Sequence, residues 1–384
     1  MNLTVKSLSG VKVRITLFLF VLLFLMAYTA PLARAQSVTT SVAVGTSPTG
    51  VAYDSSKGEV FVTNVGDNTV SIISDSSNSV LATVPVGSQP KGIAYDPSNG
   101  DVYVADTGAD TVSVISDSSN SVVATVTVGN GPNTPVYDSG NSEVYVTNSN
   151  DGTVSVISGS NAVITTISVG VLPRGIVYDQ AKGELFVADE NTGNVYVISD
   201  SSNAIIGTVS LGANNAPLGM AYDTSKGEIF VTNSGVDTVS VISDSTNAVV
   251  ATVPVGSTPY WAAYNPTSGE VFIANYGGTT VSVISDGNNA AVSTITVGSS
   301  PDRDVYDSGK GEIFVANQGS NSVSVISGGS STSSTTTASE TSGGAPSSTS
   351  AVPDFPPQFG ILVVAALLIV ISYAFARSRI RKPS

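Results

Sequence analysis

Histidine and cysteine are both absent from the 384 residues of this chain, and only 11% of its residues are charged. Their absence excludes a Ser-His-Asp triad, a cysteine nucleophile, and a zinc or haem site built on protein nitrogen or sulfur ligands. It also excludes disulfides, so the fold must be stabilised by packing. We therefore expect a non-catalytic protein with no bound metal and no cofactor. The 37 glycines, with abundant Val, Ser and Thr, favour β structure over helix.

The N-terminus has the three parts of a signal peptide. Lys6, Lys12 and Arg14 precede an apolar stretch at 15–28, and an Ala-Arg-Ala triplet of the cleavable type follows. The apolar stretch is short for a bilayer-spanning helix, which disfavours the alternative of an uncleaved anchor. We predict that residues 1–35 are a signal peptide and that the rest of the chain is exported.

An uncharged apolar stretch of 18 residues at 359–376 predicts a transmembrane helix, because it would span roughly 27 Å at about 1.5 Å per residue. The basic tail at 377–384 follows at once, which by the positive-inside rule predicts a cytoplasmic C-terminus. Residues 328–358 are rich in Gly, Ser and Thr, a composition that predicts a flexible stalk open to O-glycosylation. The sequence thus predicts a single-pass protein of the cell membrane whose body lies outside the cell.

The segment Val-Pro-Asp-Phe-Pro at 352–356 resembles the PEF-type C-terminal signal that archaeal sortases recognise. Asp354 stands where that signal has glutamate. Whether the tail is cleaved is left open by this resemblance, and we expect a permanent anchor.

The body of the chain repeats one unit seven times. Its marker is V-G-x-x-P, in which Leu211 replaces Val and two residues are inserted in the fifth unit. The marker glycines are spaced by 42, 42, 41, 42, 44 and 42 residues, a period typical of repeat architectures. These glycines are Gly45, Gly87, Gly129, Gly170, Gly212, Gly256 and Gly298.

Each unit contains four strand-like runs separated by turn residues. In the first unit we expect strands at 50–53, 59–64, 69–74 and 79–86. Four short antiparallel strands per 42 residues are typical of a β-propeller blade. The seventh unit ends at 327 without a fourth strand, and 37–44 matches the fourth strand of another unit. We therefore predict an all-β, seven-bladed propeller over 36–327, closed by its N-terminal strand.

The end of each second strand follows one pattern, and at 145–148 it reads Tyr-Val-Thr-Asn. Over all seven units, 37–327, the chain resembles the YVTN-family β-propeller repeat, which is similar to archaeal surface-layer propellers. The resemblance implies a seven-bladed propeller outside the cell and leaves function open. The Tyr that ends each first strand is followed by Asp in six units and by Asn265 in the other, and this pair is interpreted as structural. The Asn or Asp that ends each second strand is also interpreted as structural, as an Asx-turn residue.

Functional sites are expected where repeats differ. The three residues after the proline of each marker vary among units and lead into the innermost strand, at one mouth of the central channel. There we predict a ligand-binding site that contains the chain's one Trp and three of the body's seven cations. The alternative is neutral variation at exposed loop starts. The candidate residues are Lys91, Arg174, Tyr260, Trp261, Asp302, Arg303 and Asp304.

These features favour a non-catalytic binding or adhesion module at the cell surface, with envelope proteins or glycans as partners and the bilayer contacted through 359–376. Nucleic acid is not expected, because the body carries seven basic and 27 acidic residues, a net charge of −20. The alternative is a propeller lyase or hydrolase that uses carboxylates, with a divalent cation, at the channel mouth. Asp302 and Asp304 would then share one face of an extended strand while Arg303 points away.

Overall fold

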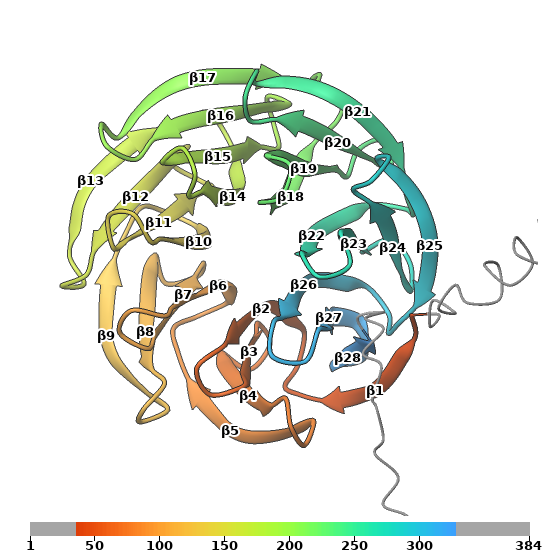
Figure 1. Ribbon diagram of the computed structural model, residues 1–384. Coiled ribbons are helices and arrows are strands. Elements are labelled where there is room, and N and C mark those ends of the chain that lie inside the picture. The colour runs from red at the N-terminus through yellow and green to blue at the C-terminus, as the bar shows by residue number, and fades with distance from the viewer. Residues whose placement is uncertain (1–35, 328–384) are drawn as a thin grey trace, which may run out of the picture. The chain divides into compact units, whose positions relative to one another are not determined.

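The computed structural model describes residues 36–327, which form a ring of seven four-stranded antiparallel sheets (Figure 1). The all-β, seven-bladed propeller predicted from the sequence is confirmed. The predicted signal peptide, stalk, transmembrane helix and basic tail lie outside the described residues. Within 36–327 no helix is both long and apolar enough to cross a membrane.

The blades are numbered 1 to 7 in the chain order of their innermost strands, each of which begins at the proline of a repeat marker. Blade 1 contains β2 (Pro48–Asp54), β3 (Glu59–Asn64), β4 (Thr69–Ser74) and β5 (Ser79–Pro85). Blades 2 and 3 contain β6 (Pro90–Asp96), β7 (Asp101–Asp106), β8 (Thr111–Ser116), β9 (Ser121–Thr127), β10 (Pro132–Asp138), β11 (Glu143–Asn148), β12 (Thr153–Ser158) and β13 (Val163–Ser168).

Blades 4 and 5 contain β14 (Pro173–Asp179), β15 (Glu184–Asp189), β16 (Asn194–Ser199), β17 (Ala204–Ser210), β18 (Pro217–Asp223), β19 (Glu228–Asn233), β20 (Thr238–Ser243) and β21 (Ala248–Pro254). Blade 6 contains β22 (Pro259–Asn265), β23 (Glu270–Asn275), β24 (Thr280–Ser285) and β25 (Ala290–Thr296). Blade 7 contains β26 (Pro301–Asp307), β27 (Glu312–Asn317), a 3-10 turn (Gln318–Ser320), β28 (Ser322–Ser327) and the N-terminal β1 (Val38–Ala43).

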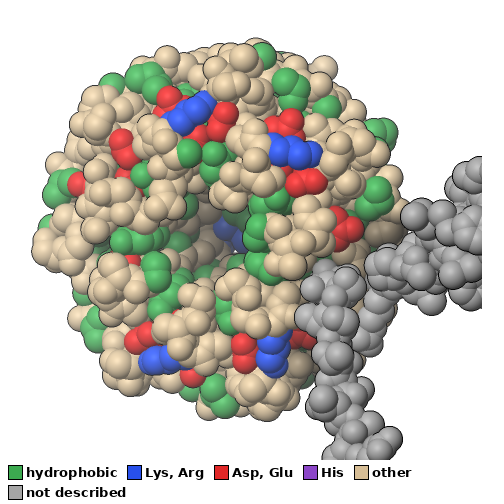
Figure 2. Space-filling model, in the orientation of Figure 1, with side chains coloured by type: hydrophobic (Ala, Val, Ile, Leu, Met, Phe, Trp, Pro, Cys, Tyr) green, Lys and Arg blue, Asp and Glu red, His purple; other side chains and the backbone are tan. Residues whose placement is uncertain are grey.

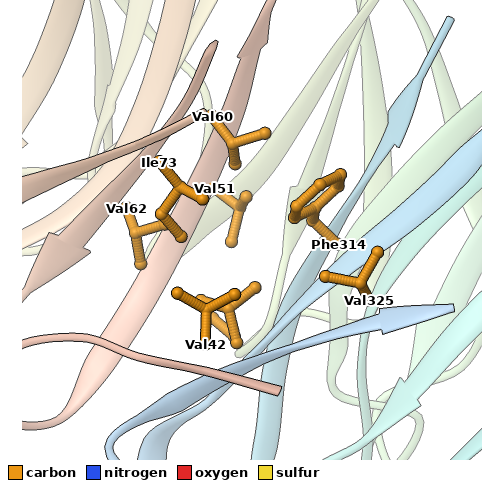
Figure 3. Packing of buried hydrophobic residues seen from close by; sticks show 9 residues of the cluster. Val42, Val51, Val60, Val62, Ile73, Phe314 and Val325 are labelled. Atoms are coloured by element: carbon orange, nitrogen blue, oxygen red, sulfur yellow. The ribbon is translucent and has the colours of Figure 1, made fainter. Parts of the chain in front are cut away.

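The closing strand lies where the sequence places it. Strand β1 pairs antiparallel with β28, with Val42 opposite Val323. Val42 is buried in the core between blades 7 and 1, where it packs with Phe314 and Val60 (Figure 3). Burying these side chains removes apolar surface from water and leaves blade 7 with the same four strands as the others.

Six of the seven inner strands end in a Tyr-Asp pair, β22 ends in Tyr264-Asn265, and these pairs have the structural role expected of them. In blade 1 the carboxylate of Asp54 accepts a hydrogen bond from the backbone N–H of Ser56 (2.8 Å), which fixes the β2–β3 turn. Tyr95 of blade 2 donates to the hydroxyl of Ser56 (3.1 Å), so the tyrosine also joins neighbouring blades.

The Asx-turn interpretation of the residue that ends each second strand is wrong for six of the seven blades. Asn64 instead donates across the sheet to the hydroxyls of Thr69 (3.1 Å) and Ser71 (2.9 Å) on the third strand. Blade 4 differs because it lacks those hydroxyl partners. There Asp189 accepts hydrogen bonds from the backbone N–H groups of Asn191 and Thr192, as an Asx turn would.

Four lysines clamp neighbouring blades together near the rim of the ring. Each extends from the turn after an inner strand to an aspartate in the next blade, at 3.0–3.8 Å. The pair that joins blade 7 to blade 1 contributes to ring closure. The four pairs are Lys57–Asp117, Lys182–Asp244, Lys226–Asp286 and Lys310–Asp75.

Candidate functional site at the channel mouth

The N-terminal ends of the seven inner strands meet around the ring axis and form the mouth of the central channel. All seven blades contribute to a cavity of about 590 Å³, a figure that includes solvent at its opening. Figure 2 shows the hollow at the centre of the ring, with basic side-chain atoms visible inside it. The cavity is lined by Thr49, Val65, Lys91, Asn133, Arg174, Leu218, Tyr260, Trp261, Tyr276, Asp302, Arg303 and Gln318.

Six of the seven candidate residues lie in this cavity, and Asp304 does not. Asp304 is 4% exposed, and neither carboxyl oxygen has a hydrogen-bond partner among the described residues. The equivalent residue in blade 1 is Val51, which packs in the core between blades. Asp304 therefore occupies an apolar position, and burial raises the pKa of its carboxyl well above the usual range.

The expectation that Asp302 and Asp304 share a face while Arg303 points away is wrong. The pairing of β26 with β27 shifts register between Pro301 and Asp304, and this irregularity breaks the alternation of side chains. Asp302 and Arg303 consequently both face the cavity. The carboxylate pair required by the catalytic alternative is not brought together there.

Arg303 lies across the channel rather than at its edge. Its guanidinium carbon is 3.8 Å from the centre of the Trp261 ring in blade 6. One of its nitrogens, Nη2, donates a 3.0 Å hydrogen bond to Asn133 in blade 3, and Nε lies 4.0 Å from a carboxylate oxygen of Asp302. Gly92 leaves room for this arrangement, since a Cβ atom there would come within 2.9 Å of Arg303 Nη1.

The body's cations divide into two groups. Four lysines form the clamps between blades, and the remaining three cations, Lys91, Arg174 and Arg303, all line the cavity. Arg174 is paired with Glu190, its Nε 2.7 Å from Oε2. The ammonium of Lys91 has no ion pair or hydrogen bond within the described residues. Burial, together with repulsion from Arg174 and Arg303, lowers the pKa of Lys91.

Aromatic rings form one wall of the cavity. The rings of Tyr260 and Tyr276 are stacked with their centres 4.8 Å apart, and the Tyr276 hydroxyl donates to the side-chain oxygen of Gln318 (2.6 Å). Burial and the nearby Asp302 carboxylate raise the pKa of Tyr260 to about 12, so its hydroxyl stays neutral at physiological pH.

Asp302 is the acidic candidate that faces the cavity. Burial raises the pKa of its carboxyl to about 6, although Arg303 and Lys91 favour the ionised form.

Within residues 36–327, no group of three or more Asp, Glu, His or Cys side chains is arranged to hold a metal ion.

Sequence reasoning missed several residues of this cavity. Asn133 occupies the same position in its unit as Lys91 and Arg174, and it binds Arg303. Tyr276 and Gln318 also line the cavity, and Glu190 pairs with Arg174. Each of these three residues follows directly after a second strand, at a position that also varies among units. Variation among the units at this turn is the sequence signal that could have identified these three residues.

Comparison with known proteins supports the fold. Residues 88–121, which include β6, β7 and β8, match the NHL repeat. Hydrazine synthase of Kuenenia stuttgartiensis is similar in structure, with a TM-score of 0.67, 17% identity, and coverage of 73% of this chain and 95% of that one. The β-propeller domain of Cps50 (Swd1) from Myceliophteria thermophila has a TM-score of 0.66, 11% identity, and coverage of 76% and 99%. No curated protein matches this chain significantly. The chain is therefore a seven-bladed β-propeller that contains an NHL repeat, and at these identities the structural likeness concerns the fold alone.

Proposed function

We propose that this protein is a membrane-anchored propeller of the YVTN surface-layer type that binds envelope proteins or glycans outside the cell through its channel mouth. The predicted signal peptide at 1–35 and apolar stretch at 359–376 support export and anchoring. The NHL repeat supports an interaction role, because propellers with such repeats are typically interaction modules.

One observation carries the binding role: the distribution of positive charge in an acidic body. Three of seven cations converge with Trp261 and Tyr260 in a single cavity, and the other four are held in clamps at the rim. A few convergent polar groups beside aromatic rings are typical of binding rather than of packing.

The binding role is tested with the full chain, purified in detergent and applied to an array of envelope glycans and proteins. Arg174→Ala and Trp261→Ala should each weaken binding at least tenfold. Lys57→Ala, which removes a cation from a rim clamp, is the matched control and should bind normally. Unchanged binding in both cavity variants would remove the channel mouth from consideration.

The location is tested separately by protease treatment of intact cells. Cleavage of the body without cell lysis is expected, with a C-terminal tag on the cytoplasmic side protected. Full protection of the body until lysis would contradict an extracellular propeller.

The second candidate function, a carboxylate-based lyase or hydrolase, has one observation in its favour. Asp302 faces the cavity, and its pKa of about 6 suits proton transfer near neutral pH. Lyase and hydrolase screens with added Ca²⁺ test this alternative. An activity that Asp302→Asn abolishes, in a variant that still folds, would favour the enzyme over the binding module.

A further inference from the structure

We propose that the channel mouth binds the carboxylate of an acidic sugar, with Lys91 and Arg174 holding the carboxylate and Tyr260 packing against the sugar ring. This inference rests on the proposed binding function and specifies the class of ligand. Three features of the cavity support it: an unpaired cation, a local charge of one sign, and the stacked tyrosines.

Lys91 is the unpaired cation. It is partly buried at the start of β6, and its ammonium has no ion pair or hydrogen bond among the described residues. The other six cations of the body each lie within 4.0 Å of a carboxylate. A partly desolvated ammonium without a counterion is costly, and a bound anion would offset that cost.

The local charge indicates an anion of a single charge. Lys91, Arg174 and Arg303 are opposed by the carboxylates of Glu190 and Asp302, which leaves one positive charge in excess when all five are ionised. Asp304 does not line the cavity and does not change this balance. A carboxylate fits the excess, whereas a doubly charged phosphate would also be repelled by Glu190 and Asp302.

The aromatic wall favours a sugar over a peptide side chain. The stacked rings of Tyr260 and Tyr276 give a flat apolar surface, and the polar side chain of Gln318 is hydrogen-bonded to Tyr276 at its edge. A sugar ring presents an apolar face together with hydroxyls around its edge, and both can be matched here. An acidic peptide would use the cations and would leave the aromatic surface largely unused.

Trp261 provides a direct reporter of the site, because it is the one tryptophan in the chain and lines the cavity against Arg303. Tryptophan emission of the full chain in detergent can be followed at neutral pH during addition of galacturonate. Galactose is the matched neutral probe, since it has the same ring without the carboxylate. Inorganic phosphate and N-acetylglutamate amide test a free anion and an acidic peptide.

The expected result is a saturable change in emission with galacturonate and none with galactose. Lys91→Met should weaken galacturonate binding at least tenfold, Lys91→Arg should largely retain it, and Lys57→Met should leave it unchanged. An equal response to galactose would overturn the proposal. So would tighter binding of phosphate or of N-acetylglutamate amide, or no response to galacturonate.

The array experiment separates this proposal from the proposed function. If galacturonate fails but Arg174→Ala still abolishes binding on the array, the channel mouth is a binding site for another ligand class. If Arg174→Ala and Trp261→Ala leave array binding unchanged, the proposed function itself is contradicted.

Discussion

The guanidinium of Arg303 lies over the ring of Trp261, 3.8 Å from its centre, and joins blades 7 and 6 inside the channel. The same side chain donates a hydrogen bond to Asn133 in blade 3, so one residue ties together three blades that are not all neighbours. Arg303 therefore has a structural role in the cavity, and Lys91, Arg174 and Tyr260 are the candidates better placed for a ligand.

Replacement of Arg303 by Met should destabilise the propeller. The change removes the cation–π contact and the hydrogen bond to Asn133, and it leaves the buried carboxylate of Asp302 without its nearest counterion. We expect a loss of about 3 kcal/mol at pH 7, measured by urea unfolding followed by circular dichroism. Lys57→Met, at a half-exposed clamp, should cost under about 1 kcal/mol. Similar losses in the two variants would contradict this role of Arg303.

Replacement of Asp304 by Val should stabilise the protein at neutral pH. The raised pKa means that the folded state holds a proton which the unfolded chain releases above about pH 4. The resulting destabilisation is absent at lower pH and grows as the pH rises. The gain in melting temperature from Asp304→Val should therefore be larger at pH 7 than at pH 4. A gain that does not depend on pH would show that Asp304 does not titrate in this way.

Asp106 predicts a second effect of pH on stability. It occupies the position held by asparagine in five of the blades, and burial raises its pKa to about 6 despite hydrogen bonds from Ser113 and Thr111. The free-energy cost of ionising the buried Asp106 carboxyl appears above about pH 4 and reaches its full size above about pH 6. Asp106→Asn should gain about 2 kcal/mol at pH 7, with little gain at pH 4. Chemical unfolding at both pH values measures this, and a loss at pH 7 would contradict it.

Removal of residues 37–44 should destabilise the ring and promote association, because β28 becomes an exposed edge strand. Thermal melting and size-exclusion chromatography measure the two effects. Since a deletion can prevent folding, Val42→Ala provides a milder test, with an expected loss of about 1–2 kcal/mol. Ser41→Ala, on the same strand but exposed, should be nearly neutral. Equal melting of the intact and deleted chains would contradict closure by β1.

The repeat pattern is sufficient to predict the number of blades, their strand order and the closing strand, because each of these depends on features that recur seven times. The ends of the strands were predicted less accurately than the number and order of the strands. The first inner strand begins at Pro48, two residues before the predicted Gly50. Proline is tolerated at the first position of a strand, and the sequence pattern alone did not include it.

The cavity was predicted less completely than the fold. Variation among the units located six of its lining residues, but it could not indicate that the register shift in β26 turns Arg303 inward and Asp304 into the core. Nor could it indicate that the side chain of Arg303 crosses to Asn133, 170 positions earlier in the chain. Such contacts depend on how the seven blades are placed around the axis, which is a property of the assembled ring.

Ring closure also constrains the order of events during synthesis. The backbone N–H of Ser327 donates to the carbonyl of Ser37, across a sequence separation of 290 residues. Strand β1 is synthesised first and therefore has no partner until β28 has been made. The segment between these two paired strands, which must form a closed loop, is nearly the whole body. A chain that ends prematurely anywhere in β28 contains all six complete blades and still lacks a finished ring.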